Sequence, residues 1–230
     1  MARPAALVTG GARRIGEAIV RRFAAEGWHV VIHCHTAGAQ AAALASEFAS
    51  AEVVCCDLAD TPAAQAMIER LAERLEDWRV LVNSASVFRP DTAAALDPTT
   101  FAEAMQVNAA APAAMAQHYL RLARSRAGRR VIDLTDQKLA NPNPDFFSYT
   151  ASKHALAATV PMMAMAAEPP DRVFALAPGA ILASHDQSPA ETEDSHRMNL
   201  LRRRTGPEEV AEAAWFLATS PLTSGQTLFV

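Results

Sequence analysis

The sequence predicts an α/β fold with one doubly wound parallel sheet of about seven strands and helices on both faces. Two observations support this prediction. Short β-type runs alternate with helix-period segments along all 230 residues, and a glycine-rich turn follows the first run. Since no internal repeat, linker or change of composition divides the chain, we predict a single domain spanning residues 1–230.

Each predicted element rests on a local pattern. Apolar and β-branched runs between turn residues predict strands at residues 5–9, 30–33, 52–56, 79–83, 130–135, 172–176 and 226–230. Apolar residues three and four apart predict helices at residues 14–26, 62–76, 101–124 (with a break near Asn108), 148–167 and 207–218. Pro161 predicts a kink or an early end in its helix. The polar stretch 182–199 has neither pattern, and its length predicts a lid over the substrate.

Composition excludes several classes of protein. The net charge of −4, from 21 Lys and Arg against 25 Asp and Glu, argues against a nucleic-acid partner, which needs a basic surface. No apolar run approaches the roughly 20 residues of a membrane span. We recognise no signal peptide and expect a cytoplasmic protein. Cys34, Cys55 and Cys56 form a poor disulfide framework without Cys-x-x-Cys spacing, so we expect unpaired cysteines and no metal.

The segment from Thr9 to Gly16 reads Thr-Gly-Gly-Ala-Arg-Arg-Ile-Gly and joins the first strand to the first helix. Glycine lets the backbone turn tightly and approach a pyrophosphate, which then binds the free amides at the helix N-terminus. This placement predicts a dinucleotide site. Its cofactor-binding residues in the turn are Gly10, Arg13, Arg14, Ile15 and Gly16.

The end of the second strand indicates which dinucleotide binds. It reads His33-Cys34-His35-Thr36, without the carboxylate that usually holds the ribose hydroxyls of NAD. An arginine from the glycine turn could bind a 2′-phosphate with its planar donor fork, so NADPH is favoured over NADH. Alternatively, both arginines are only solvated. At the adenosine end we predict contacts from His35, Asp57 and Leu58, although Asp57 could simply form a turn.

Tyr149 and Lys153 lie four residues apart on a predicted helix and so share one face. A nearby positive charge favours the phenolate and lowers the pKa of a phenol. The pair therefore predicts a general acid or base that works near neutral pH.

Three further motifs accompany this pair: Asn83-Ser84-Ala85-Ser86, Asn108 in a helical segment, and Pro178-Gly179. Together they make the chain resemble the short-chain dehydrogenase/reductase family over essentially its whole length. The resemblance implies a Rossmann-type fold and an NAD(P)H-dependent oxidoreductase. It implies that Tyr149 moves the substrate proton, that Lys153 holds the nicotinamide ribose and tunes Tyr149, and that Asn108 supports a water-linked proton path. Further cofactor contacts are implied at Asn83, Ala85, Ser86, Pro178 and Gly179.

The departures from the family pattern narrow the resemblance. Arg14 replaces the middle glycine of the turn, Asp136 replaces the catalytic serine, and Ser86 ends the Asn-x-Ala motif. These features look like the pteridine reductase and dihydromonapterin reductase branch. That resemblance implies that Asp136 works with Tyr149 to protonate a ring nitrogen, that Phe88 stacks on the pterin, and that Ser86 contacts substrate and cofactor. The branch often has arginine where this chain has Thr36, so the preference for NADP rests on Arg14 and His35.

The sequence is also compatible with other functions. The chain could be a carbonyl or 3-oxoacyl reductase on the same scaffold, or a nucleotide-binding protein without turnover. Phe88 could be a core residue and Asp136 a turn residue. The family resemblance also implies a homotetramer or homodimer through the helices at 109–124 and 148–167. Many of the chain's 51 alanines lie there, and their small side chains allow helices to approach closely.

Overall fold

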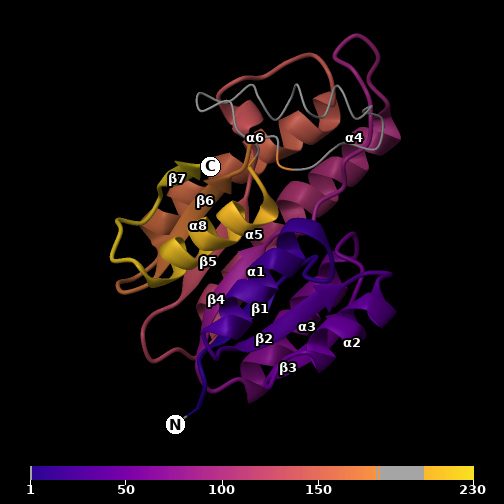
Figure 1. The fold of residues 1–230 in the computed structure, drawn as a ribbon. Helices are drawn as coiled ribbons and strands as arrows, with labels where there is room; N and C mark the ends of the chain where they lie inside the picture. The colour runs from indigo at the N-terminus through magenta and orange to yellow at the C-terminus, as the bar shows by residue number, and fades with distance from the viewer. Residues whose placement is uncertain (1, 180, 182–204) are drawn as a thin grey trace.

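Seven parallel strands form one sheet in the computed structural model, which describes residues 2–179, 181 and 205–230. The strand order is β3-β2-β1-β4-β5-β6-β7 (Figure 1). The strands are β1 (Ala5–Val8), β2 (His29–Cys34), β3 (Ala51–Cys55), β4 (Trp78–Asn83), β5 (Arg130–Leu134), β6 (Arg172–Ala177) and β7 (Thr227–Phe229). The prediction of a Rossmann-type parallel sheet is confirmed.

Helices cover both faces of this sheet. In the described part of the chain they are α1 (Arg14–Ala25), α2 (Gly38–Ser46), α3 (Thr61–Arg74), α4 (Pro98–Met105), α5 (Ala111–Leu122), α6 (Phe147–Ala166) and α8 (Pro207–Thr219), with a π-helical η1 (Gln106–Ala110) and a 3₁₀ turn η2 (Gln137–Leu139). Alternate strand residues face opposite sides, so Val30 and Ile32 pack with α1, α2 and α8, whereas Val31 packs with α3 and α5. Figure 1 shows α1 and α8 side by side on one face.

Three features of the helices differ from or refine the expectations. Helix α2 was not predicted, because its run of small residues has little apolar periodicity and no side-chain cap. The break near Asn108 is confirmed, and it takes the form of η1 between α4 and α5. Helix α6 continues through Pro161 to Ala166, so an early end there was wrong. The predicted lid at 182–199 lies outside the described residues.

The expectation about cysteines was also wrong. Cys34 and Cys55 are joined in a disulfide. They are register partners on the parallel strands β2 and β3, with Cα atoms 4.8 Å apart. Strand register is not visible in residue spacing, which is why the pairing could not be foreseen. Cys56 is free.

The described residues contain no helix that is both long and apolar enough to cross a membrane. They also contain no group of three or more His, Cys, Asp or Glu side chains placed to hold a metal ion.

The buried ring of His33 joins the carboxyl ends of three strands. Its Nδ1 accepts a hydrogen bond from the Gly10 amide (3.2 Å), and its Nε2 lies 3.2 Å from the carbonyl oxygen of Cys56. The neutral ring satisfies both contacts when Nε2 carries the proton. Burial lowers the pKa of His33 to about 4. The ring therefore holds the glycine turn after β1 against the residues that follow β3.

We predict that His33 makes stability depend on pH. The unfolded histidine, with its pKa near 6.5, takes up a proton before the folded one does. Stability from His33 is therefore complete above pH 6.5 and is lost as the pH falls toward 4, by about 3 kcal/mol. The variant His33→Gln should be less stable than wild type by about 1–3 kcal/mol at pH 7.5, and this gap should shrink at pH 4.5.

Urea unfolding of both proteins at the two pH values measures the gap. Burial raises the pKa of Asp133 to about 6, which acts in the opposite direction, but Asp133 is present in both proteins and cancels from the difference. A gap that stays constant with pH would contradict the assignment.

Candidate active site

Strands β1 and β4 are neighbours from which the chain winds in opposite directions, and in such sheets ligands bind at the carboxyl ends beside this point. Here the glycine turn comes very close to the loop after β4. Gly10 has a φ of +64°, and a Cβ on it would lie 3.0 Å from the Cα of Ala85. A Cβ on Gly16 would collide with the main-chain oxygen of Gly10. These two positions require glycine, and the turn exposes its backbone as a phosphate site needs.

Thr9 fixes the distance between the turn and the loop after β4. Its hydroxyl oxygen accepts hydrogen bonds from the amides of Ser84 and Ala85, each 3.0 Å long, and lies 3.4 Å from the Val82 carbonyl oxygen. Both segments that the sequence assigns to the cofactor are therefore held together by one buried hydroxyl.

Arg14 occupies a strained backbone position at the start of α1. Its φ is +55°, in the left-handed region that costs a residue with a side chain roughly 1–2 kcal/mol. Arg13 and Arg14 are both exposed. The positive charge of Arg14 acts to lower the pKa of Tyr149, so its guanidinium lies within electrostatic range of that phenol. Arg14 therefore connects the glycine turn with the chemical end of the site.

The residues assigned to the adenosine end form a small cluster. His35 Nε2 lies 3.8 Å from Asp57 Oδ2, and both side chains are at least half exposed. Asp57 Oδ1 also accepts the amide of Ala59 (2.9 Å), so Asp57 forms a turn as well as facing His35. Leu58 is buried. The structure thus brings His35 and Asp57 together at the sheet edge.

Asp136 and Tyr149 form the central contact of the site. The Tyr149 hydroxyl donates to Asp136 Oδ2 over 2.7 Å, and the amide of Lys138 donates to Asp136 Oδ1 over 2.8 Å. Both carboxylate oxygens of Asp136 are therefore oriented. Thr135 cannot take the place of a catalytic serine, because its buried hydroxyl donates to the Leu176 carbonyl (3.2 Å).

The electrostatics of Tyr149 differ from the expectation. Burial, followed by the charge and hydrogen bond of Asp136, raises the pKa of Tyr149 well above 10. The predicted lowering by Lys153 was wrong, because burial penalises the phenolate and the Asp136 carboxylate, which accepts a hydrogen bond from the hydroxyl, also favours the neutral phenol. Lys153 is buried, and its Nζ donates to the Leu134 carbonyl (2.7 Å) and lies 5.6 Å from the centre of the Tyr149 ring. Burial lowers the pKa of Lys153 to about 8.

Asn108 has its side chain fully engaged with protein groups. Its Oδ1 accepts from the Val87 amide (2.8 Å) and the Ser86 hydroxyl (3.1 Å). Its Nδ2 donates to the Val87 carbonyl (2.9 Å) and the Ser152 hydroxyl (3.0 Å). Pro112, four residues later, has no N–H, so no α-helical hydrogen bond reaches the main-chain carbonyl of Asn108. The side chain of Asn108 joins the loop after β4 to α6.

Asn83 lies beneath the site. Its Nδ2 donates to Asp133 Oδ1 over 2.7 Å, and both side chains are buried between β4 and β5. The Asn83 side-chain amide is thus used inside the sheet. Pro178 is buried, and its carbonyl accepts the Gln137 amide (2.9 Å), which brings this turn beside Asp136. Gly179 donates its amide to the Val230 carbonyl (2.8 Å).

Phe88 lies in an aromatic group with Phe146 and Tyr149. Its ring stacks on Phe146, with centroids 4.1 Å apart and planes 15° apart, and meets Tyr149 at 87° and 4.6 Å. Phe88 keeps 38% of its surface exposed, so it is not a core residue. The structure therefore places an accessible aromatic surface beside the Tyr149 hydroxyl.

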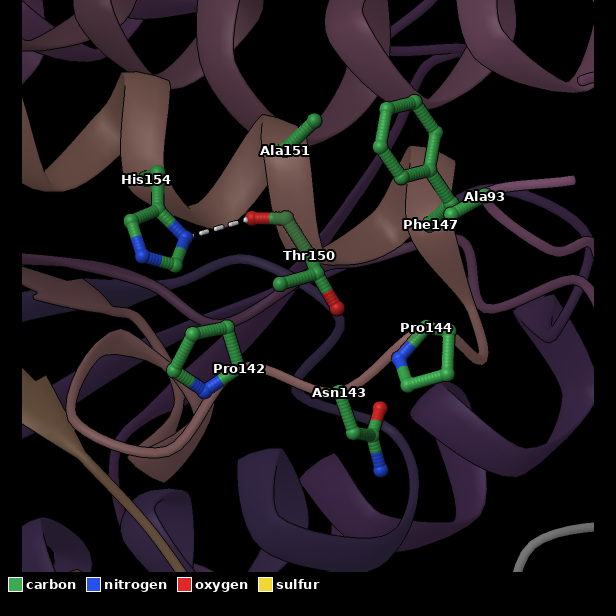
Figure 2. Close-up of a pocket in the computed structure, with 8 residues that line it drawn as sticks. All are labelled: Ala93, Pro142, Asn143, Pro144, Phe147, Thr150, Ala151 and His154. Atoms are coloured by element: carbon green, nitrogen blue, oxygen red, sulfur yellow. Dashed lines mark hydrogen bonds between the residues drawn. The ribbon is translucent and has the colours of Figure 1, made fainter.

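A hollow of about 340 Å³ lies on the other side of α6 (Figure 2). Figure 2 shows Thr150 and His154 on the side of α6 that faces the loop at residues 142–144. Because successive helical residues are about 100° apart, these residues point away from Tyr149 and Lys153. The hollow is therefore separate from the Asp136–Tyr149 pair.

Comparison with known proteins identifies the family. A family model described as Enoyl-(Acyl carrier protein) reductase matches residues 10–230. Granaticin polyketide synthase putative ketoacyl reductase 2 from Streptomyces violaceoruber is 31% identical over 99% of this chain and 94% of its own length. The chain belongs to the short-chain dehydrogenase/reductase family. It is accordingly an NAD(P)H-dependent oxidoreductase.

Two other members of the family are similar along almost the whole chain. Pteridine reductase 1 from Leishmania tarentolae is 28% identical over 94% of this chain and 90% of its own length. The structure of FolM alternative dihydrofolate reductase 1 from Brucella suis, in complex with NADP, superposes with a TM-score of 0.92 and 32% identity over 98% of this chain and 92% of that one.

Sequence reasoning missed several residues that shape the site of this short-chain dehydrogenase/reductase. They are Thr9, His33, Asp91, Asp133 and Phe146. Thr9 follows β1 and Asp133 lies near the end of β5, where polar residues are common, so only the three-dimensional contacts distinguish them. The contact of His33 with the Gly10 amide joins residues 23 positions apart and has no local signal in the sequence.

We predict that Arg14→Gly separates cofactor binding from folding. Glycine relieves the left-handed strain but increases the freedom of the unfolded chain, so the free energy of unfolding should change by less than about 1 kcal/mol. If the guanidinium binds a phosphate of the cofactor, the Kd for NADPH should rise about tenfold with the loss of one charged hydrogen bond. Calorimetric titration with NADPH and NADH measures this, and an unchanged Kd for NADPH would contradict the role.

Proposed function

We propose that this protein reduces a flat, nitrogen-containing ring of the pteridine class, such as dihydrobiopterin, dihydromonapterin or dihydrofolate, with NADPH. The observation that carries the proposal is the 2.7 Å hydrogen bond from the Tyr149 hydroxyl to Asp136 Oδ2. A carboxyl group stands where the family's usual site has a serine. Unlike a serine hydroxyl, this carboxylate accepts a hydrogen bond from the phenol and favours its neutral, proton-carrying form.

The chemistry needs one hydride and one proton for each C=N bond reduced. NADPH supplies the hydride when it is bound. The Asp136–Tyr149 pair holds the proton, since the phenol stays neutral and its hydrogen lies between the two oxygens. Delivery of that proton to a ring nitrogen leaves Tyr149 as a phenolate, which adds a second negative charge beside the Asp136 carboxylate. Lys153, 5.6 Å from the phenol ring, stabilises that charge.

Proton resupply from solvent would pass Asn108. Its side chain is engaged with Ser86, Val87 and Ser152, so a contact from Asn108 to a water molecule would come from its main-chain carbonyl. The π-helical turn η1 is a local irregularity of the kind often found at functional sites. Asn108 would therefore act through its backbone.

The preference for NADPH is supported by the exposed Arg13 and Arg14 in the glycine turn and by His35 at the end of β2. A histidine and two arginines suit a 2′-phosphate, and the carboxylate that would repel it is absent from residues 33–36. The similar Brucella suis protein was crystallised with NADP.

We predict that Asp136→Ser affects two substrate types differently. Reduction of dihydrobiopterin should fall by about 10²-fold or more, because the carboxylate that orients the phenolic proton toward the ring nitrogen is lost. Reduction of a simple ketone should fall less, since serine serves the family's carbonyl reductases. NADPH consumption measured for both substrates tests this, and Tyr149→Phe should abolish both. Equal effects of Asp136→Ser on the two substrates would favour the alternative below.

A ketoreductase on an aromatic ring is the second candidate. The similarity to the granaticin ketoacyl reductase favours it. The exposed ring of Phe88 suits a flat carbonyl substrate as well as a pterin. The carboxyl group at position 136 is what favours the pteridine class.

We also propose that a second copy of the chain covers the alanine-rich face formed by α4, η1, α5 and α6. A hollow of about 320 Å³ there is lined by Ala102, Met105, Gln106, Ala109, Ala110, Ala113, Ala155 and Thr159, without a charged residue. Met162 and Met165 on α6 are 57% and 80% exposed. Small and flexible apolar side chains of this kind suit close contact between helices.

We predict that Ala155→Glu, which places a charge on this face, shifts the protein toward a 24.6 kDa monomer in sedimentation velocity. Ala25→Glu, at an exposed end of α1 on the opposite side of the sheet, is the matched control and should leave the oligomer intact. A wild-type protein that is already monomeric would contradict the proposed interface.

A further inference from the structure

One face of the Phe88 ring is covered by another ring. Phe146 stacks on it with centroids 4.1 Å apart and planes nearly parallel. Phe88 lies within the loop that follows β4 and is 38% exposed, and it also meets Tyr149 at 87° with centroids 4.6 Å apart. The stacked partner restricts rotation about χ1 and so restricts the plane in which Phe88 can meet a ligand.

The backbone of Phe146 is held in place by Asp91. Phe146 has a φ of +53°, which is an outlier for a bulky residue. Its amide donates to the Asp91 carbonyl oxygen over 2.8 Å. The Asp91 carboxylate accepts from the Ser148 amide (3.0 Å and 3.2 Å) and from the Ser148 hydroxyl. Asp91 therefore caps the start of α6 from the loop that also carries Phe88.

The ring of Phe146 is also contacted by a cation. Lys138 Nζ lies 5.2 Å from the centre of the ring, in the range of a cation–π interaction. The same nitrogen donates to Asn143 Oδ1 (2.8 Å) and to the Asp145 carbonyl (3.1 Å). Burial lowers the pKa of Lys138. Lys138 follows Asp136 by two residues. The segment that carries Asp136 therefore also carries the cation that contacts the Phe146 ring.

We propose that Phe146 is a positioning residue that fixes the ring plane of Phe88 and so gives the enzyme its preference for flat aromatic substrates over small aliphatic ones. This rests on the proposed function only for the choice of a pterin, since any flat ring would use the same surface. Ordering a free side chain at the moment of binding costs affinity. Phe146 removes that cost before the substrate arrives. Holding the Phe146 ring in this position requires the strained backbone of Phe146, and the contacts with Asp91 stabilise that backbone.

The test compares Phe146→Leu with two reference variants. Phe146→Tyr keeps a ring and should restore wild-type behaviour. Phe147→Leu removes the neighbouring ring, which lines the hollow on the other side of α6 (Figure 2), whereas the rings that contact Phe88 are those of Phe146 and Tyr149. Each protein, loaded with NADP, is titrated calorimetrically with 2,4-diaminopteridine. KM and kcat are measured with dihydrobiopterin, with 9,10-phenanthrenequinone as a flat carbonyl probe, and with ethyl acetoacetate as a small aliphatic one.

We expect Phe146→Leu to raise the Kd of diaminopteridine and the KM of both flat substrates about threefold to tenfold. Its KM for ethyl acetoacetate and its Kd for NADPH should stay within about twofold of wild type. The combined variant with Phe88→Leu should be no weaker than Phe88→Leu alone, because Phe146 acts through Phe88.

Four outcomes would overturn the proposal. They are unchanged constants for flat ligands in Phe146→Leu, an equal loss for the aliphatic substrate, the same loss in Phe147→Leu, and a wild-type protein that binds no flat ligand. If wild type reduces the quinone but not dihydrobiopterin, the pteridine function fails, while Phe146 is still judged on the quinone and on the titration.

Discussion

The parallel pairing of β4, β5 and β6 is the constraint on which the site depends. Parallel strands end at one edge, so the loop after β4, the Asp136 segment after β5 and the Pro178 turn after β6 all lie there. Hydrogen bonds across this edge set the spacing. Thr135 reaches the Leu176 carbonyl, and Gln137 reaches the Pro178 carbonyl. The Asp136–Tyr149 contact also depends on where α6 begins, and the Asp91 carboxylate holds the first turn of α6 through the Ser148 amide.

Much of this architecture could be predicted from sequence. Alternating strand and helix patterns, a glycine turn, and the pair Tyr149 and Lys153 predict a doubly wound sheet with chemistry on one helix. The proximity of Asp136 and Tyr149 was inferred from family resemblance. Contacts that depend on register or on distant loops were not accessible. The Cys34–Cys55 pairing needs the alignment of β2 with β3, and the capping of α6 by Asp91 joins residues 57 positions apart.

The electrostatics of the site show why residue type alone misleads. A lysine four residues after a tyrosine suggests a lowered phenol pKa. In the folded chain, burial and Asp136 dominate, and the pKa of Tyr149 rises. Buried Lys153 itself loses affinity for protons, because removal from water penalises its charge. A neutral phenol that holds its proton suits an enzyme working in the direction of reduction.

Arg14 and Phe146 are the non-glycine residues with positive φ in the described part of the chain, and both border the site. Each presents a side chain where glycine would be more comfortable. Natural proteins often trade stability for activity in this way. Glycine at position 14 would leave the free energy of unfolding almost unchanged, and glycine at position 146 would also remove the ring that stacks on Phe88. Stability measurements alone would therefore not mark either position as functional, whereas measurements of cofactor and substrate binding would.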